Sequence, residues 1–292
     1  MCFGVRDAIQ LAIEQSQSEP LTILGDLVHN ETVLADLNAR GIRVALELSG
    51  VGTHTVMITA HGTSWKTMRT VRDSGFKIVE ATCPLVHVAH RAVAKLVTEG
   101  YYPIIIGKRG HVEVRGLTED LAEFDVVLSD EDILDLKERP RFGVAAQTTQ
   151  PIEKVRSLVD FLRRRFPNSD VRFIDTVCQP TKQRQNAAIE LAQRSDVVVV
   201  IGGAHSNNTH ELVKTCGRYC ERVHHVQTAE DLRVEWFENA EVVGVTAGTS
   251  TPESSIRQVE NWLEELVDRK IRISSSNLQN PTDEAVPAVP RD

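Results

Sequence analysis

Three cysteines occupy equivalent places in this sequence, although they lie far apart along the chain. Cys2, Cys83 and Cys178 each stand just before a stretch with helical periodicity. A strand-like run, 76–79, leads into the second cysteine, which places its thiol at the carboxyl end of a predicted strand. A histidine on a polar loop follows the three cysteines after 27, 28 and 27 residues. We therefore interpret the chain as three copies of one unit that bring three thiols to a common point.

Three converging thiols could hold an iron–sulfur cluster or zinc, or form a redox relay. Zinc fingers use short cysteine spacings, whereas the gaps here are 81 and 95 residues. A [4Fe–4S] cluster needs four iron ligands, so three thiolates leave one iron open to activate a substrate oxygen. Cys216 and Cys220 are spaced as on one helix, and either could be a fourth ligand. Neither matches the repeated position, and we expect both to be structural.

The loops predicted to face these thiols are rich in neutral hydrogen-bond donors. They carry His29, His61, His111, Ser206, Asn207, Asn208 and Ser250. Several of these positions are at predicted helix N-termini, where backbone N–H groups and the helix dipole favour anions. The set suits a phosphate or diphosphate. No Gly-x₄-Gly-Lys-Ser/Thr loop is present, which argues against nucleotide hydrolysis.

Glu113 is the candidate proton donor. It stands two residues after His111 on a stretch that reads as a strand, so the two side chains are expected to share a face. Burial and nearby negative charge raise the pKa of a carboxyl and allow it to deliver a proton near neutral pH. Thr148 lies in a polar turn of the same unit and could relay or orient that proton.

The elements around these residues predict an α/β fold. Helical stretches alternate with short apolar strands such as 21–24 and 197–201, as expected for parallel sheets. We expect three similar α/β modules in a pseudo-threefold trefoil around a central iron–sulfur site. The predicted modules are 1–83, 84–174 and 175–273, and we expect 274–292 to be a disordered tail.

Composition narrows the class of partners. The net charge of −8 argues against nucleic acid, and no apolar run approaches the ~18 residues of a membrane span. The sequence begins in a helix-like stretch without the pattern of a signal peptide. Five cysteines without close pairing are typical of a reducing compartment, so we expect a cytoplasmic protein.

As a set, these motifs closely resemble those of the 4-hydroxy-3-methylbut-2-enyl diphosphate reductase family, which belongs to the methylerythritol phosphate route to isoprenoids. The matching segments are Cys-Phe-Gly-Val at 2–5, Val-His-Asn at 28–30, Ala-His-Gly at 60–62, Ala-Thr-Cys-Pro-Leu-Val at 81–86, Gly-His-Val-Glu-Val at 110–114, Gln-Thr-Thr at 147–149, Ser-Asn-Asn at 206–208 and Val-Thr-Ala-Gly-Thr-Ser at 245–250. They run through nearly the whole chain.

The resemblance implies a trefoil around a [4Fe–4S] cluster with Cys2, Cys83 and Cys178 as ligands. It implies that the diphosphate is held by His29, His61, His111, Thr148, Ser206, Asn207, Asn208 and Ser250. Asn207 stands where the family usually has serine, and it keeps a donor. Glu113 and Thr148 would deliver protons while two electrons remove the allylic hydroxyl as water. The products would be isopentenyl and dimethylallyl diphosphate, with electrons from a ferredoxin or flavodoxin.

The sequence departs from the family pattern ahead of its first cysteine. Family members carry a strand and Gly-Phe ahead of the first cysteine, whereas Met1 alone precedes Cys2 here. Either the start codon is misassigned or this ligand is at a frayed terminus, so we expect weaker cluster retention than in a longer relative.

The alternative functions are an iron–sulfur redox sensor and a reductive dehydratase for another phosphorylated substrate. A sensor would not need the anion-binding loops or Glu113.

Overall fold

Three parallel β-sheets form the framework of the protein in this computed structural model. The structure describes the backbone of residues 1–277 and the side chains of residues 1–268. The first sheet has the order β2-β1-β3-β4, the second β6-β5-β7-β8 and the third β10-β9-β11. In each sheet the first strand of the module lies between the second and the third, so this three-strand order occurs three times. Among the described residues, the third sheet has three strands, whereas the other two have a fourth. Every strand pair is parallel.

The strands are short, and the central ones are buried. The first sheet consists of β1 (Leu21–Leu24), β2 (Arg43–Ala45), β3 (Thr55–Ile58) and β4 (Lys77–Glu80). The second consists of β5 (Tyr102–Ile106), β6 (Asp125–Val127), β7 (Arg141–Ala146) and β8 (Asp170–Phe173). The third consists of β9 (Val197–Ile201), β10 (Arg222–Val226) and β11 (Val243–Ala247). Every residue of β9 is buried, as expected for a continuous apolar run with helices on both faces of its sheet.

Helices connect these strands and cover the sheets. The first module has α1 (Phe3–Ser18), α2 (Glu31–Ala39), η1 (Leu48–Gly50) and α3 (Trp65–Asp73). The second has α4 (Pro84–Thr98), α5 (Val112–Thr118), α6 (Asp130–Leu134) and α7 (Ile152–Arg165). The third has α8 (Gln179–Ala192), α9 (Asn207–Cys216), η2 (Ala229–Asp231), η3 (Val234–Phe237) and α10 (Glu253–Asn277). Separate apolar cores lie in the three parts of the chain.

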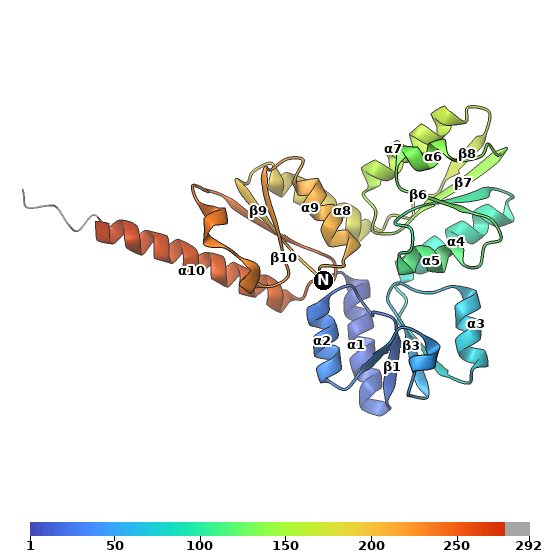
Figure 1. Ribbon diagram of the computed structural model, residues 1–292, viewed down its shortest axis with the longest axis horizontal. Coiled ribbons are helices and arrows are strands. Elements are labelled where there is room, and N and C mark those ends of the chain that lie inside the picture. The colour runs from blue at the N-terminus through green and yellow to red at the C-terminus, as the bar shows by residue number, and fades with distance from the viewer. Residues whose placement is uncertain (278–292) are drawn as a thin grey trace, which may run out of the picture.

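The three lobes meet at one point, and the N-terminus lies there (Figure 1). The α/β trefoil predicted from the sequence is therefore confirmed, whereas the module boundaries at 83/84 and 174/175 stay a prediction. The expected tail began at Ser274, and α10 continues to Asn277. The rest of that segment, 278–292, lies outside the described residues. In the described part of the chain, no helix has the length and apolar character needed to cross a membrane.

Candidate functional site

The three predicted cysteine ligands share one local structure. Cys2, Cys83 and Cys178 are the N-cap residues of α1, α4 and α8, and none of them makes a side-chain capping bond. All three are free thiols and partly buried. Because helix N-termini favour negative charge, three such positions suit thiolates or an anionic group bound to them.

The backbone N–H of each cysteine donates a hydrogen bond to a carbonyl in a polar turn, and the three turns belong to three different modules. The N–H of Cys83 donates to Ala60 O at 3.0 Å, and that of Cys178 donates to Thr148 O at 3.0 Å. The N–H of Cys2 donates to Thr249 O at 2.9 Å, in the third module. In the first two sheets, the cysteine that makes this bond follows the last strand, β4 or β8. In the third sheet, the bond comes from Cys2 at the start of the chain. The three cysteines are therefore held in equivalent ways, although the third sheet has three described strands and the other two have four.

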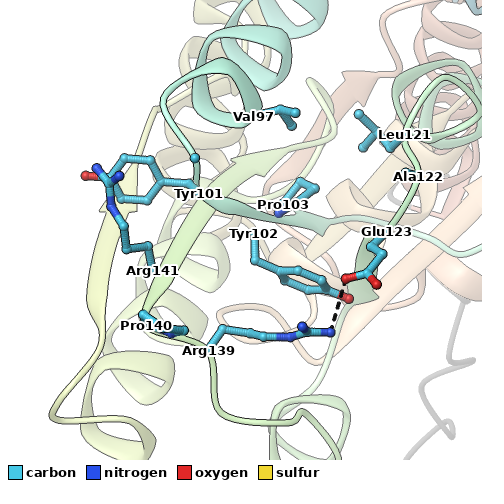
Figure 2. A pocket seen from close by; sticks show the side chains of 11 residues that line it. Val97, Tyr101, Tyr102, Pro103, Leu121, Ala122, Glu123, Arg139, Pro140 and Arg141 are labelled. Atoms are coloured by element: carbon cyan, nitrogen blue, oxygen red, sulfur yellow. Dashed lines mark ion pairs between the residues drawn. The ribbon is translucent and has the colours of Figure 1, made fainter.

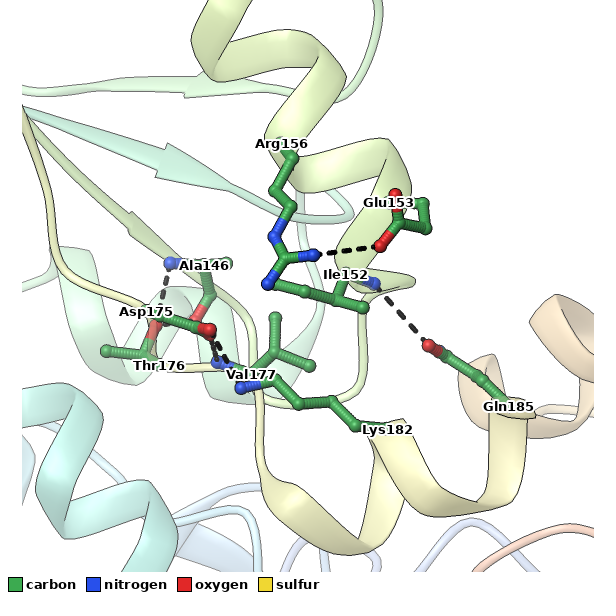
Figure 3. A network of polar contacts seen from close by, with 9 residues as sticks. All are labelled: Ala146, Ile152, Glu153, Arg156, Asp175, Thr176, Val177, Lys182 and Gln185. Atoms are coloured by element: carbon green, nitrogen blue, oxygen red, sulfur yellow. Dashed lines mark hydrogen bonds and ion pairs between the residues drawn. The ribbon is translucent and has the colours of Figure 1, made fainter. Parts of the chain in front are cut away.

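The loop before Cys178 is held by its own polar network (Figure 3). The Thr176 hydroxyl accepts the N–H of Ala146 at 2.8 Å and donates to the carbonyl of the same residue at 2.6 Å. Asp175 accepts the N–H of Val177 at 3.1 Å and pairs with Lys182 of α8 at 2.8 Å. These bonds join the loop to β7 and to α8, and so they fix where α8 begins.

The thiols lie within electrostatic reach of one another. Burial raises the pKa of Cys83 and of Cys178, and negative charge on Cys2 and Glu113 raises both further. Among the described residues, no three His, Cys, Asp or Glu side chains come close enough to hold a single metal ion. In an iron–sulfur cluster each thiolate binds a different iron, so the cysteines need not converge on one ion. The donor set therefore fits a cluster better than zinc.

Three histidines from two modules pack against one another beside this site. The His29 and His61 rings stack with centroids 4.3 Å apart, and the His111 ring meets them edge-on at 5.1 and 5.7 Å. Burial lowers the pKa of all three, that of His61 to well below 6.5 and that of His111 to about 3. His29 Nε2 and His61 Nδ1 are buried without a hydrogen-bond partner in the described part of the chain. All three rings are therefore neutral near pH 7.

His111 is the N-cap of α5, which corrects one expectation. Its Nδ1 accepts the N–H of Glu113 at 3.1 Å, so the ring proton is on Nε2, which remains able to donate. The sequence predicted a strand here, whereas Glu113 lies in the first turn of this helix. The alternating apolar residues around it were misleading because an imidazole can cap a helix in place of the usual Ser, Thr, Asp or Asn.

Glu113 is almost fully buried, with 1% of its surface exposed. Burial raises the pKa of its carboxyl from 4.5 to about 7, and hydrogen bonds from the backbone and side chain of Thr148 limit the rise. The Thr148 N–H donates to Glu113 Oε1 at 2.6 Å. Because the N–H of Cys178 bonds to the carbonyl of Thr148, this threonine links the carboxyl to the cysteine. A carboxyl with this pKa can hold a proton and release it at neutral pH.

A cavity of about 40 Å³ collects most of the remaining candidates. Its lining includes His29, His61, His111, Glu113, Ser206, Asn207, Asn208 and Ser250. Ser206 caps α9, and Asn208 Nδ2 is buried with no partner among the described residues. The Ser250 hydroxyl donates to the His29 carbonyl at 3.2 Å, across the junction of two modules. Unpaired donors at a helix N-terminus suit a phosphate group.

Sequence reasoning missed four residues that also line this cavity. Thr149 follows the predicted Thr148, and Thr249 precedes the predicted Ser250, each in the same polar turn. This position next to a predicted residue could have identified them. The Asn207 amide reaches Thr149 Oγ1 at 3.5 Å, which links the second and third modules. Val5 and Val28 give the cavity an apolar side, for which the sequence contained no signal.

Comparisons with known proteins agree with this geometry. A family described as LytB protein matches residues 1–264. A curated protein of Trichlorobacter lovleyi named 4-hydroxy-3-methylbut-2-enyl diphosphate reductase is 37% identical over 267 residues, which cover 91% of this chain and 95% of the relative. A protein of the same name from Geobacter sulfurreducens is 36% identical and covers 92% and 95%. The chain belongs to the LytB family.

Solved structures show the same relationship for the fold. The LytB-family chain resembles a structure titled as the E-1-hydroxy-2-methyl-but-2-enyl-4-diphosphate reductase of Plasmodium falciparum, with a TM-score of 0.84 and 26% identity. That match covers 89% of this chain and 84% of the other. A second structure, titled as the terminal enzyme of the non-mevalonate pathway, has a TM-score of 0.66 and 33% identity, with coverage of 91% and 96%.

Two features of this LytB-family chain lie away from the site. Cys216 and Cys220 are buried in the core of the third module, where burial raises the pKa of Cys216 to about 11. A larger cavity of about 400 Å³ lies at the amino ends of β5 and β7, opposite the ends that lead toward the cysteines. Figure 2 shows Arg139 across the ring of Tyr102, 4.4 Å from its centroid, in that cavity.

Proposed function

We propose that this chain reduces 4-hydroxy-3-methylbut-2-enyl diphosphate to isopentenyl and dimethylallyl diphosphate. The single observation that carries the proposal is the position of Glu113. A buried carboxyl with a pKa of about 7 lines the same cavity as three neutral histidines, within electrostatic reach of Cys83 and Cys178. The names of the relatives supply the substrate, and this arrangement supports the chemistry.

The proposed resident group is a [4Fe–4S] cluster held by Cys2, Cys83 and Cys178. When bound, such a cluster supplies electrons one at a time and an open iron that accepts an oxygen ligand. The three N-cap positions, each fixed by a backbone bond to a polar turn, support this ligand set. We propose a ferredoxin or flavodoxin as the electron donor, and a cytoplasmic location because all five cysteines are free thiols.

The diphosphate end of the substrate would be held by neutral donors. His111 presents Nε2–H because its Nδ1 is occupied as a helix cap. The unpaired His29 Nε2 and Asn208 Nδ2 and the N-terminus of α9 at Ser206 provide further hydrogen-bonding capacity. Neutral donors cost less to bury than charged ones, and a hydrogen bond to an anion is stronger than one to a neutral acceptor. Ser250 and Asn207 would complete the grip.

Protons would come from Glu113, which lines the same cavity. The reaction takes up two electrons and two protons and releases the allylic hydroxyl as water. Glu113 holds a proton on its buried carboxyl below about pH 7 and can donate it toward the departing oxygen. Thr148 orients that carboxyl through its N–H. Once ionised, Glu113 is unfavourable in its buried setting, which drives its reprotonation for the next step.

An anaerobic turnover assay tests this function. Reconstituted protein is mixed with the hydroxymethylbutenyl diphosphate and a reduced viologen, and both C5 diphosphate products are quantified. We expect both products and the oxidation of two viologens per substrate. Protein that carries its cluster but forms neither product would contradict the proposal and favour the redox sensor. Turnover of a different allylic phosphate alone would favour a related reductive dehydratase.

A further inference from the structure

Arg184 is a half-buried cation that none of the roles above explains. It lies on α8, six residues after the N-cap Cys178. Its Nη1 donates to Ala247 O at 2.6 Å and approaches Gly248 O at 3.4 Å. Ala247 is the last residue of β11, and Gly248 begins the polar turn that follows it. The guanidinium therefore joins the helix that begins at Cys178 to the turn of the third module.

The turn that Arg184 holds is the one that binds Cys2. Thr249 follows Gly248 directly, and its carbonyl accepts the Cys2 N–H at 2.9 Å. The turn is fixed at its other side by the bond from the Gly248 N–H to Ile201 O at 2.8 Å. One side chain thus connects the positions of two of the three thiols, which are 176 residues apart in the sequence.

One donor of this guanidinium is unpaired. Arg184 Nε is buried and has no hydrogen-bond partner in the described part of the chain. A buried N–H without an acceptor costs free energy, so such a donor calls for an acceptor that is not a protein group. Burial lowers the pKa of Arg184, but negative charge on Cys2 and Cys178 raises it again, so the cation lies within reach of both sulfurs.

We propose that Arg184 is a positioning residue of the cysteine site, which holds the Cys2 turn against the Cys178 helix and places a positive charge beside the group that the thiols bind. The inference rests on the proposed function, because that group is the proposed cluster. Its unpaired Nε–H would donate to a sulfur atom of that group. A nearby cation and a hydrogen bond to sulfur favour the more negative, reduced state and raise the reduction potential.

Two substitutions separate the positioning role from the charge. Arg184→Gln removes the cation, whereas Arg184→Lys keeps the charge but loses the planar guanidinium, whose Nη1 contacts the two carbonyls and which carries the unpaired Nε–H. Arg194→Gln is the matched control, because Arg194 is exposed just beyond the other end of the same helix. Circular dichroism and thermal unfolding verify that each protein is folded.

The first readout needs no cluster. In cluster-free full-length protein, the alkylation rate of Cys2 is followed by mass spectrometry of its peptide, with Cys83 as the internal reference. Loss of hydrogen bonds from a charged donor should make Cys2 react about tenfold faster in Arg184→Gln. Arg184→Lys should also react faster, and Arg194→Gln should match the wild type. An unchanged Cys2 rate in Arg184→Gln overturns the positioning role.

The second readout is the midpoint potential of the reconstituted cluster, measured by an anaerobic redox titration with electron paramagnetic resonance. We expect a more negative potential in Arg184→Gln and a value close to the wild type in Arg184→Lys. Equal potentials in the wild type and Arg184→Gln overturn the role of the charge. If the wild type itself takes up no iron, the proposed function fails, while the alkylation experiment still decides whether Arg184 positions Cys2.

Discussion

Gly4 lies directly against Cys83, with no room for a methyl group between them. A Cβ at Gly4 would be 2.5 Å from Cys83 Sγ and 3.1 Å from Cys83 Cβ. Gly4 is buried in the first turn of α1, two residues after Cys2. The contact therefore brings the helix that begins at Cys2 against the thiol that begins α4, and it sets how closely these two cysteines approach.

We predict that Gly4→Ala lowers iron retention without unfolding the protein. The added methyl should displace the Cys83 thiol or the start of α1, at a cost of about 1–3 kcal/mol for overpacking. The higher helix propensity of alanine offsets about 1 kcal/mol of that loss. Iron and sulfide per chain after anaerobic reconstitution measure the effect. Gly50→Ala is the control, because its new Cβ would meet Ala45 Cβ at an ordinary 3.5 Å. Equal iron content in Gly4→Ala and the wild type would show that the contact does not position the thiol.

Glu113→Gln should bind the substrate but reduce it slowly. Glutamine keeps the acceptor for the Thr148 N–H but cannot supply a proton, so we expect kcat to fall by about 10²–10⁴-fold with little change in affinity. In the wild type, kcat/KM should fall as the pH rises through about 7, because the carboxyl then loses its proton. Stopped-flow turnover against pH measures both effects, and the exposed Glu123→Gln is the matched control. Near-normal turnover of Glu113→Gln would exclude Glu113 as the proton donor.

The same buried carboxyl should make the protein less stable as the pH rises. The pKa of Glu113 is about 7 in the folded chain, against an ordinary value of 4.5, so its contribution to stability is full below pH 4.5 and is lost as the pH rises to 7. The shift corresponds to about 3 kcal/mol. Glu113→Gln should therefore gain stability relative to the wild type at pH 8 and not at pH 4.5. Urea unfolding at both pH values measures the difference, and a gain of equal size at both would contradict this origin.

The strands and the three thiol positions could be predicted because their signals are local. The runs 21–24 and 197–201 are continuous apolar segments between polar turns, and β1 and β9 have these bounds. The repeated order of cysteine, helix, strand and histidine loop likewise required no knowledge of distant contacts. Residue types and spacing alone therefore predict three equivalent modules.

The remaining features depend on contacts that no local pattern encodes. The bond from Cys2 to Thr249 joins nearly opposite ends of the described chain, so nothing near Cys2 indicates that the third module holds it. Arg184 resembles any polar residue of α8 until its carbonyl partners are known. The strand expected at Glu113 was wrong because the capping bond from His111 decides the conformation there, and that bond depends on how the imidazole turns.

His111→Asn should make the protein more resistant to acid. Burial lowers the pKa of His111 from 6.5 to about 3, so its contribution to stability is full above pH 6.5 and is lost as the pH falls below that value. At pH 5 the loss is about 2 kcal/mol. Asparagine is a good N-cap and can still accept the N–H that starts α5, so the helix should be retained. We expect the stability of His111→Asn relative to the wild type to improve by about that amount between pH 7.5 and pH 5, measured by urea unfolding. The variant should also bind inorganic diphosphate more weakly, because the Nε2–H donor is gone. His54→Asn, at an exposed position, is the control, and a pH-independent difference between His111→Asn and the wild type would show that this histidine is not held neutral by burial.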